Sequence, residues 1–322
     1  MQHFSWKCIR PFRCMRERGE FVPSRGTTGR GVDHPRGRPL PQGSRCVAGV
    51  GYGDPVPLVI TTVNVNGVRA AAAKGLVDWL ASSAADIVCL QEVRATEKQF
   101  HAAIAPALEA GWHCVGAESS AKGRAGVAIL SRVPADAVRV GFDVDEFASA
   151  GRYIEADFGD VTVGSLYLPT GEAQTPKQDE KEHFMKSFAT YLAERYAAVT
   201  AAGRDMVVCG DWNIAPTERD IKNWKGNVKK SGFLPEERAW VGDLLDAGWR
   251  DVVRDLHGDV AGPYSWWSYR GKAFDTDAGW RIDYHLVTPG LAARATEARV
   301  ERAASYDRRW SDHAPVTVAF DR

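Results

Sequence analysis

The 322-residue sequence lacks any apolar run of the roughly 18 residues that a membrane-spanning helix requires, so we expect no membrane partner. It has only 6 cysteines, with no C-x-x-C pair and no metal-ligand spacing, so we expect a reducing compartment and buried free thiols. It also lacks net charge, with 41 Lys+Arg against 41 Asp+Glu. A neutral total usually argues against a nucleic-acid partner.

The charge is, however, unevenly distributed along the chain. Residues 1–57 contain 10 Lys+Arg and 4 Asp+Glu, whereas the remaining residues contain 31 and 37. The first segment is rich in Gly, Pro and Ser and has no apolar periodicity, so it cannot bury enough surface to offset its ordering entropy. We therefore expect residues 1–57 to be a basic, disordered extension without the apolar core of a secretory signal, and residues 58–322 to be a single domain.

Beyond this extension, strand-like and helix-like segments alternate. Apolar runs predict strands at 58–66, 86–92, 125–131, 205–213, 281–288 and 314–320. The runs 152–158 and 161–168, separated by Gly159-Asp160, predict a hairpin. Apolar spacing predicts helices over 97–109 and from Asp179 onward. This mixture favours an α/β fold with mixed sheets over a Rossmann fold.

Polar side chains gather at the ends of these predicted strands. They are Asn64 and Asn66, Glu92, Asp211 and Asn213, Asp283, and the pair Asp312-His313. Taken singly, each is more often a turn residue, a cap or a solvated side chain. Their joint position at strand ends, where α/β proteins build their sites, favours an oxygen-rich centre for a hard cation such as Mg²⁺. The pattern alone indicates a metal-assisted hydrolase.

The exact sequences of the motifs are more specific than the positions of their polar residues. In chain order between Leu58 and Phe320, they read NVNGVRA, LQEVRAT, GRAGVAILS, LYLPTGE, GDWNIAPTERDI, FLPEERAW, YSWWSYR, GWRIDY and SDHAPV. Together they resemble the exonuclease III family of abasic-site endonucleases, within the endonuclease/exonuclease/phosphatase superfamily. The resemblance implies a four-layered α/β sandwich of two mixed β-sheets flanked by helices. It also implies a Mg²⁺-dependent nuclease, with Mn²⁺ able to substitute.

The resemblance assigns a metal site and an activity. Glu92 would be the principal metal ligand, with Asn66 and Asp312 as further members of the site. Some relatives carry Asp at the position of Asn66, and a neutral Asn would bind a single metal less tightly. The implied reaction is cleavage of the phosphodiester 5′ to abasic sites in duplex DNA, with 3′–5′ exonuclease and 3′-phosphodiesterase trimming.

By the same resemblance, the catalytic set is Tyr167, Asp211, Asn213, Asp283, His313 and Asn64. Asp211 would orient or deprotonate the attacking water, and Asn64 and Asn213 would hold Asp211 and the phosphate in position. His313 would donate to a phosphate oxygen, and the carboxylate of Asp283 would orient the imidazole and favour its protonated form.

Substrate contacts follow from the aromatic motifs. Trp266, Trp280 and Ile282 match positions that line the pocket for an extruded abasic sugar, whereas we expect Trp267 to fill the core. Arg152 matches a phosphate-contacting position. Basic residues flank the motifs, and the expected partner is duplex DNA with abasic sites or blocked 3′ ends. We expect a monomer in the bacterial cytoplasm, associated with the nucleoid.

Two positions depart from the family pattern, and two alternative functions remain open at this point. Val63 stands where many relatives carry an aromatic residue or Ser-Trp, and Thr170 where others carry Asn or Gln. A different phosphoesterase of the superfamily, acting on inositol phosphates, phospholipid head groups or general DNA, would share the GDWN and SDH elements. A non-catalytic DNA-binding relative would be favoured by substitution of Glu92, Asp211 or His313, yet all three are present.

Overall fold

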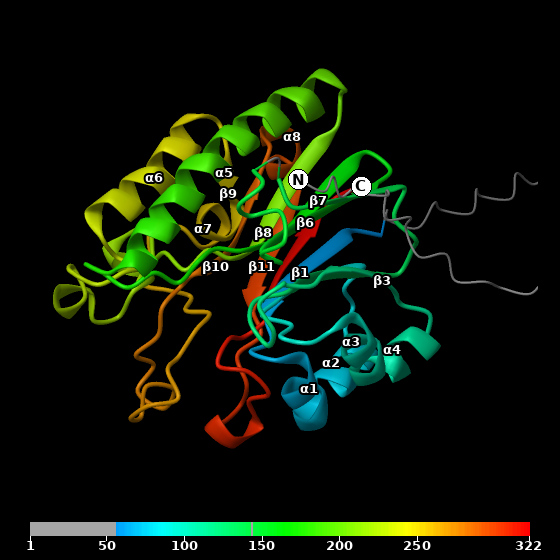
Figure 1. Cartoon of the computed structure of the whole chain (residues 1–322), viewed down its shortest axis with the longest axis horizontal. Helices are drawn as coiled ribbons and strands as arrows, with labels where there is room; N and C mark the ends of the chain where they lie inside the picture. Colours follow the sequence, from blue (N-terminus) through cyan, green and yellow to red (C-terminus); the bar gives the residue numbers. More distant parts are fainter. Residues whose placement is uncertain (1–55, 143) are drawn as a thin grey trace, which may run out of the picture. The chain divides into compact units, whose positions relative to one another are not determined.

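A computed structural model describes residues 56–142 and 144–322 of the chain. Apart from its last two residues, the segment 1–57 that we expect to be an extension lies outside the described residues. The described part contains two six-stranded β-sheets with helices on their outer faces (Figure 1). This arrangement confirms the predicted four-layered sandwich. Among the described residues, no helix combines the length and the apolarity needed to cross a bilayer.

The first sheet is mixed, because β1 runs parallel to β2 while every other neighbouring pair is antiparallel. In spatial order its strands are β11 (Ala295–Val300), β12 (Val316–Phe320), β1 (Leu58–Asn64), β2 (Ile87–Gln91), β4 (Val127–Ser131) and β3 (His113–Ala117). The central strands β2 and β4 are buried along their whole length. Their sequences IVCLQ and VAILS are accordingly almost entirely apolar, as strands covered on both faces require.

The second sheet is mixed in the same way, with β7 parallel to β8. In spatial order its strands are β5 (Ala137–Val140), β6 (Tyr153–Phe158), β7 (Val161–Tyr167), β8 (Asp205–Asp211), β10 (Asp283–Val287) and β9 (Arg250–Asp251). The predicted hairpin is β6–β7, in which Phe158 pairs with Val161. Gly159 adopts a φ of +58° in the two-residue turn, a conformation that glycine reaches without strain.

Helices cover the outer face of each sheet. Figure 1 shows α1 to α4 against the first sheet and α5 and α6 against the second. The helices are α1 (Val68–Ala71), α2 (Val77–Ser82), α3 (Glu97–Ala103), α4 (Ala105–Glu109), α5 (Pro176–Ala201), α6 (Pro235–Asp246), α7 (Val252–His257) and α8 (Pro289–Ala292). A π-helical turn joins α1 to α2, and short 3-10 turns occur at Glu218–Asp220, Trp224–Gly226 and Tyr306–Arg308.

An apolar core holds the two sheets together. Its members come from strands of both sheets and include Ile60, Ile129, Val163, Val207 and Val318, all fully buried. Removal of these side chains from water is the main stabilising contribution to such a packing. Because the same core contacts both sheets, it also fixes the ends of their strands relative to one another.

Two predicted helices differ from the observed ones at their ends. The segment 97–109 forms two helices, because Ile104 leaves the helical region (φ −107°, ψ 14°) just before Pro106, whose ring cannot continue a helix. The helix expected from Asp179 begins earlier, at Pro176. Thr175 accepts a hydrogen bond from the Lys177 backbone N at 3.3 Å and so caps it, and proline is favoured in a first turn.

One residue of β10 makes stability depend on pH. His285 is fully buried, and neither ring nitrogen has a hydrogen-bond partner among the described residues. Burial disfavours the imidazolium and lowers the pKa of His285 to about 3. Below its ordinary pKa of about 6.5, the unfolded chain therefore binds a proton that the folded chain does not. This contribution to stability is complete above pH ~6.5 and is lost progressively as the pH falls toward ~3.

We predict that His285→Leu makes the protein less sensitive to acid. Between pH 7 and pH 5 the free energy of unfolding of the wild type should fall by about 2 kcal/mol more than that of the variant, since 1.5 pH units below the unfolded pKa correspond to about that energy. Urea unfolding of both proteins at the two pH values measures the difference. Equal losses in the two proteins would show that His285 does not titrate in this way.

Candidate active site

The topology brings strand ends from both sheets to one place. β1 and β8 end at Asn64 and Asp211, whose side chains are hydrogen-bonded to each other across the two sheets. β10 runs antiparallel to β8 with Asp283 paired opposite Asp211, so it begins where β8 ends. β12 runs antiparallel to β1, which places His313, three residues before β12, at the same end. The predicted catalytic residues are therefore neighbours.

Asn64 links carboxylates from the two sheets. Its Nδ2 donates to Glu92 Oε1 at 2.8 Å and to Asp211 Oδ2 at 2.9 Å, while its Oδ1 accepts from the backbone N of Asn66 at 2.9 Å. Asn64 is fully buried, so water cannot replace these bonds. One amide group thus holds two like-charged groups close together.

His313 lies between two acidic side chains. Its Nδ1 is bonded to Asp283 Oδ2 at 2.8 Å, and its Nε2 lies 3.8 Å from Asp211 Oδ2, too far for a hydrogen bond. Burial alone would lower the pKa of His313, but the charges of Asp283 and Asp211 overcome it and raise the pKa to about 10. At neutral pH the ring is therefore an imidazolium with two N–H donors.

Asp211 is fixed by the chain that follows it. Its Oδ1 accepts from the backbone N of Asn213 at 2.9 Å, and Asn213 Nδ2 donates to Leu168 O at 2.9 Å, which ties the loop after β8 to the loop after β7. Burial raises the pKa of Asp211 to about 7, although the charge of His313 opposes the rise. A carboxyl group with a pKa near neutrality can accept a proton from water under physiological conditions.

The three predicted metal ligands lie beside this group. Asn66 Nδ2 donates to Asp312 Oδ1 at 2.8 Å, and Trp266 Nε1 donates to Asp312 Oδ2 at 3.0 Å. Glu92 Oε2 is buried and makes no hydrogen bond within the described residues, and the guanidinium of Arg94 forms an ion pair with it. Glu92 is thus anchored through one carboxylate oxygen, and its other oxygen faces a positive charge. An oxygen in this setting is suited to bind a cation.

The backbone of these metal-ligand loops is strained. Asn66, Glu92 and Arg94 have left-handed φ angles of 45°, 49° and 50°. Such conformations cost roughly 1–3 kcal/mol each and persist where surrounding bonds enforce them. One such bond joins the two loops directly, from Gly67 N to Glu92 O at 2.8 Å. Arg94, one of the basic residues beside the motifs that we expect to face DNA, instead forms an ion pair with the predicted metal ligand Glu92.

Another set of side chains also offers closely spaced ligand atoms. One atom each of Asp211, Asp283 and His313 lies within 4.8 Å of the others. A metal ligand must be deprotonated, however, and His313 is held in its protonated form by these two carboxylates. Protonation of His313 disfavours this set in the absence of a cation, whereas the predicted ligands Glu92, Asn66 and Asp312 offer oxygen atoms, which a hard cation prefers.

Tyr167 and Arg152 adjoin the polar group. Tyr167 ends β7 and pairs with Asp211 in the register of β7 and β8. The guanidinium of Arg152 lies 5.1 Å from the centroid of the Tyr167 ring and 3.9 Å from the carboxylate of Glu180. Burial raises the pKa of the Tyr167 hydroxyl, helped by the negative charges of Glu92 and Asp211, so it remains a neutral donor.

An apolar wall stands next to the polar group. Its members are Ala215, Ile221, Phe233 and Ile282 together with Trp224, Trp266 and Trp280. The rings of Trp266 and Trp280 meet edge to face with centroids 5.9 Å apart, and Trp266 lies 6.4 Å from the His313 ring. The three predicted pocket residues thus belong to one cluster, whereas Trp267 is only 2% exposed and fills the core as expected.

Sequence reasoning missed two buried residues that support the site. Ser265 Oγ donates to Asp283 Oδ2 at 2.6 Å and accepts from the backbone N of Asp283 at 3.1 Å, which fixes the carboxylate behind His313. Lys181 Nζ donates to Asn213 O at 2.9 Å. Ser265 stands inside the motif YSWWSYR, which was an available signal. Lys181 lies in the charged run PKQDEKEH, where nothing marks which lysine faces inward.

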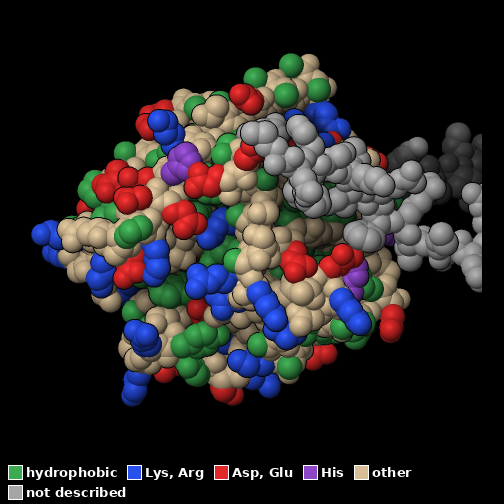
Figure 2. Space-filling view, viewed as in Figure 1, with side chains coloured by type: hydrophobic (Ala, Val, Ile, Leu, Met, Phe, Trp, Pro, Cys, Tyr) green, Lys and Arg blue, Asp and Glu red, His purple; other side chains and the backbone are tan. Residues whose placement is uncertain are grey.

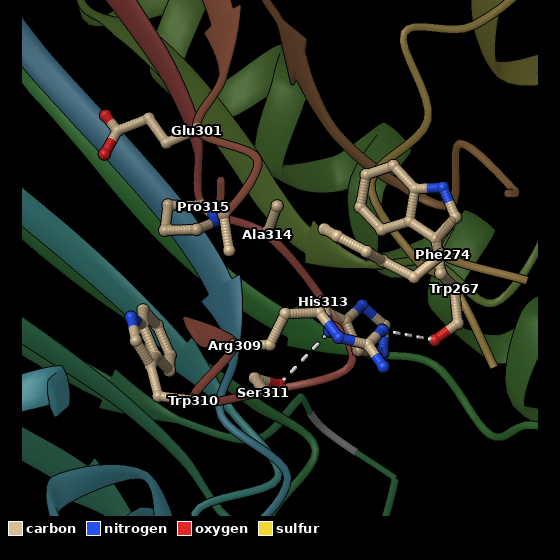
Figure 3. Close-up of a pocket in the computed structure, with 10 residues that line it drawn as sticks. Trp267, Phe274, Glu301, Arg309, Trp310, Ser311, His313, Ala314 and Pro315 are labelled. Carbon is tan, nitrogen blue, oxygen red and sulfur yellow. Dashed lines mark hydrogen bonds between the residues drawn. The ribbon is translucent and has the colours of Figure 1, made fainter. Parts of the chain in front are cut away.

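A small cavity next to His313 shows how its loop is held (Figure 3). Arg309 donates to Trp267 O at 3.1 Å, and Ser311 Oγ accepts from the backbone N of His313 at 3.2 Å. Ser311 Oγ also donates to Asn64 O at 2.7 Å. These bonds attach the loop that precedes β12 to the end of β1.

Charged side chains are unevenly spread over the surface. Figure 2 shows Lys and Arg side chains gathered on the lower half of this face, where Figure 1 places α1 and the loops near residues 270 and 305. The loop near residue 270 lies between the Trp266 and Trp280 positions of the apolar wall. This part of the face therefore offers positive charge to a polyanion.

Known proteins share both the sequence and the fold of the chain. Residues 61–313 match the Endonuclease/Exonuclease/phosphatase family. The chain is 33% identical over 270 residues to exodeoxyribonuclease III of Haemophilus influenzae, with 80% of this chain and 97% of that protein covered.

Two solved structures extend the comparison. The chain is 35% identical to a 3′–5′ exonuclease from Neisseria meningitidis, with a TM-score of 0.74 and coverage of 82% of this chain and 100% of that one. It is 30% identical to an AP endonuclease from Archaeoglobus fulgidus, with the same TM-score and the same coverage. The match in sequence, the shared fold and the convergence of the motif residues at one end of both sheets establish that the chain belongs to the endonuclease/exonuclease/phosphatase family, in its exonuclease III group of hydrolytic nucleases.

Proposed function

We propose that the protein is a Mg²⁺-dependent DNA-repair nuclease that cleaves the phosphodiester 5′ to abasic sites in duplex DNA. The products are a 3′-hydroxyl and a 5′-deoxyribose phosphate, and the same site trims 3′ ends as a 3′–5′ exonuclease and 3′-phosphodiesterase. The observation that carries the proposal is the convergence of Asp211 and the His313–Asp283 pair with Glu92, beside an apolar wall that includes Trp266.

Glu92, Asn66 and Asp312 would hold the cation, Mg²⁺ or its substitute Mn²⁺. When bound, the cation neutralises charge on the phosphodiester and stabilises the departing 3′ oxygen. Glu92 suits this role because Asn64 fixes its Oε1, while its Oε2 has no hydrogen bond within the described residues and faces the guanidinium of Arg94, in whose place a cation would bind. Two carboxylates and one neutral amide supply the all-oxygen set that hard cations prefer.

Asp211 would take the proton of the attacking water. Its carboxylate is held by Asn64 and by the backbone N of Asn213, so it is oriented before substrate arrives. His313 would donate from Nε2 to a non-bridging phosphate oxygen, because its Nδ1 is already bonded to Asp283. A protonated imidazole aimed at the phosphate stabilises the charge that develops in the transition state.

The remaining predicted residues would bind the substrate. Tyr167 and Arg152, next to Asp211 in the second sheet, would contact phosphates of the strand that is cut. Trp266, Trp280 and Ile282 would line the pocket for the extruded abasic sugar. An apolar slot suits a deoxyribose without a base and disfavours a complete nucleotide, which is a steric route to selectivity.

The proposal also covers the domain organisation, the oligomeric state and the location of the protein. Residues 58–322 would be the catalytic domain, because every residue assigned a role lies between Asn64 and His313, and residues 1–57 a dispensable basic extension. One chain supplies all these groups, which is consistent with a monomer. Because the proposed substrate is duplex DNA with abasic sites or blocked 3′ ends, the proposed location is the bacterial cytoplasm, in association with the nucleoid.

A cleavage assay tests the activity directly. We expect the protein to cut a duplex that carries one abasic site in Mg²⁺, at the phosphodiester 5′ to the lesion, and EDTA to stop the reaction. Gel analysis of labelled strands locates the cut, and parallel duplexes with a 3′-phosphate or a recessed 3′ end report trimming. An identical duplex without a lesion is the control. An abasic strand that stays intact in Mg²⁺ would refute the proposal.

We predict that Asp211→Asn lowers turnover by about 10²–10⁴-fold, the usual contribution of a general base, because an amide cannot take a proton from water. The affinity for the abasic duplex, measured in EDTA, should change little. Asp246→Asn, an exposed position at the end of α6, is the matched control. Near-normal turnover in the Asp211 variant would exclude this residue as the base.

We predict that Glu92→Gln raises the Mg²⁺ concentration required for half-maximal cleavage by at least about tenfold, since changes to metal-ligand partners alone cost 10–100-fold in metal affinity. A Mg²⁺ titration of the cleavage rate measures the shift. Glu109→Gln, which alters an exposed carboxylate on α4, serves as the control. An unchanged Mg²⁺ requirement in the Glu92 variant would place the cation elsewhere.

A further inference from the structure

A buried lysine lies directly behind the loop that follows β8. Lys181, on α5, has no exposed side-chain surface, and its Nζ forms an ion pair with Glu237 Oε1 on α6 at 2.8 Å. The same Nζ donates to Asn213 O at 2.9 Å and to Thr170 O at 3.3 Å. A buried ion pair usually adds little stability over apolar side chains of the same size. This pair therefore invites an explanation beyond stability.

Glu237 extends the same network to a third segment. Its Oε2 accepts from the backbone N of Gly232 at 2.6 Å and of Leu234 at 3.1 Å. The Ser231 hydroxyl lies within hydrogen-bonding distance of Glu237 Oε1 (2.9 Å) and Thr170 O (2.8 Å), and its single proton can be donated to either. One pair of buried charges thus binds the loop after β7, the loop after β8 and the segment that precedes α6.

These three segments carry the site or touch it. The loop after β8 contains Asn213, whose backbone N holds Asp211, and Ala215 N in the same loop donates to Gly232 O at 2.8 Å. Gly232 packs so closely that a Cβ there would lie 2.9 Å from the Trp280 ring and 3.1 Å from Asn213 O. Because the packing is this tight, we expect a substitution of Lys181 to displace Asn213.

The charge of Lys181 also acts on the site. Burial lowers the pKa of Lys181, whereas the negative charges of Glu237 and Asp211 favour its ammonium form. Lys181 thus places a positive charge, screened from solvent, within electrostatic reach of Asp211. Because its side chain is fully covered by protein, it cannot contact DNA.

We propose that Lys181 is a positioning residue for phosphodiester hydrolysis, which holds Asn213, and through it Asp211, in the geometry that turnover requires. The inference rests on the role proposed above for Asp211. The proposal predicts separate effects of the ion pair on stability and on turnover. Loss of the pair should affect stability through the unpaired charge and turnover through the released carbonyl of Asn213.

Three variants separate these effects. Lys181→Met keeps the aliphatic stem but leaves Glu237 buried and unpaired. The double variant Lys181→Met/Glu237→Gln removes both charges. A glutamine oxygen can still accept from Gly232 and Leu234. Gln178 Nε2 donates to Glu237 Oε1 at 3.1 Å in the wild type, so its side-chain amide must rotate by 180° to offer Oε1 to the new amide group. Lys177→Met, an exposed lysine one turn earlier on α5, is the matched control.

The measurements are thermal unfolding, kcat on the abasic duplex and the Kd for that duplex in EDTA, all at a temperature at which circular dichroism shows each variant folded. We expect Lys181→Met to lower both Tm and kcat. The double variant should regain most of the lost Tm, because a neutral buried pair costs little. Its kcat should remain at least about tenfold below wild type, since small displacements of catalytic groups cost up to about 10²-fold. The Kd should stay within about twofold.

Recovery of kcat together with Tm in the double variant would overturn the proposal and leave Lys181 a purely structural residue. A wild-type kcat in Lys181→Met would do the same. The test is independent of the preferred substrate. A wild type that leaves the abasic duplex intact refutes the proposed function, and the kcat ratios are then taken on a recessed 3′ end or on bis(p-nitrophenyl) phosphate.

Discussion

The two hydrogen bonds donated by the side-chain amide of Asn64 are the interactions on which the rest of the site depends. The amide donates one hydrogen from the end of β1 to Glu92 in its own sheet and the other to Asp211 in the second sheet. Two carboxylates without this donor would repel each other across the junction of the sheets. The apolar core brings the strand ends together, and the hydrogen bonds from the Asn64 amide offset the repulsion between the two carboxylates. An aspartate at this position would add a third negative charge and remove the donor.

Every carboxylate of the site is similarly matched by a positive or donor group. Asp283 faces the imidazolium of His313, Glu92 faces the guanidinium of Arg94, and Lys181 supplies a buried charge near Asp211. The excess of acidic residues after residue 57 is therefore partly the site itself, and it does not argue against a DNA partner. What matters for DNA is the local distribution of charge, and Figure 2 shows basic side chains on the lower half of one face.

Much of this could be predicted from sequence, because apolar runs mark buried strands and polar residues at their ends mark the site. The strands β2 and β8 and the hairpin β6–β7 are confirmed close to the predicted bounds. The packing around them could not be predicted. Alternation along a strand would place Asn64 and Asn66 on one face, but β1 ends at Asn64, and Asn66 adopts a left-handed conformation. Lys181 has no signal in the sequence, since its role depends on contacts with residues 32 to 56 positions away.

The neutral Asn66 illustrates why the number of charged residues is an incomplete guide to the proposed metal site. Its Nδ2 donates to Asp312 Oδ1 at 2.8 Å, so the amide oxygen remains available as a ligand. An aspartate in its place would set two carboxylates side by side with no donor between them, and the cation would first have to overcome their repulsion. In the proposed metal site, Asn66 would therefore attract the cation less strongly than an aspartate, but it would provide a ligand arrangement that is stable before the cation arrives. Pre-organisation of this kind lowers the free-energy cost of binding, because the ligands need not be ordered at that moment.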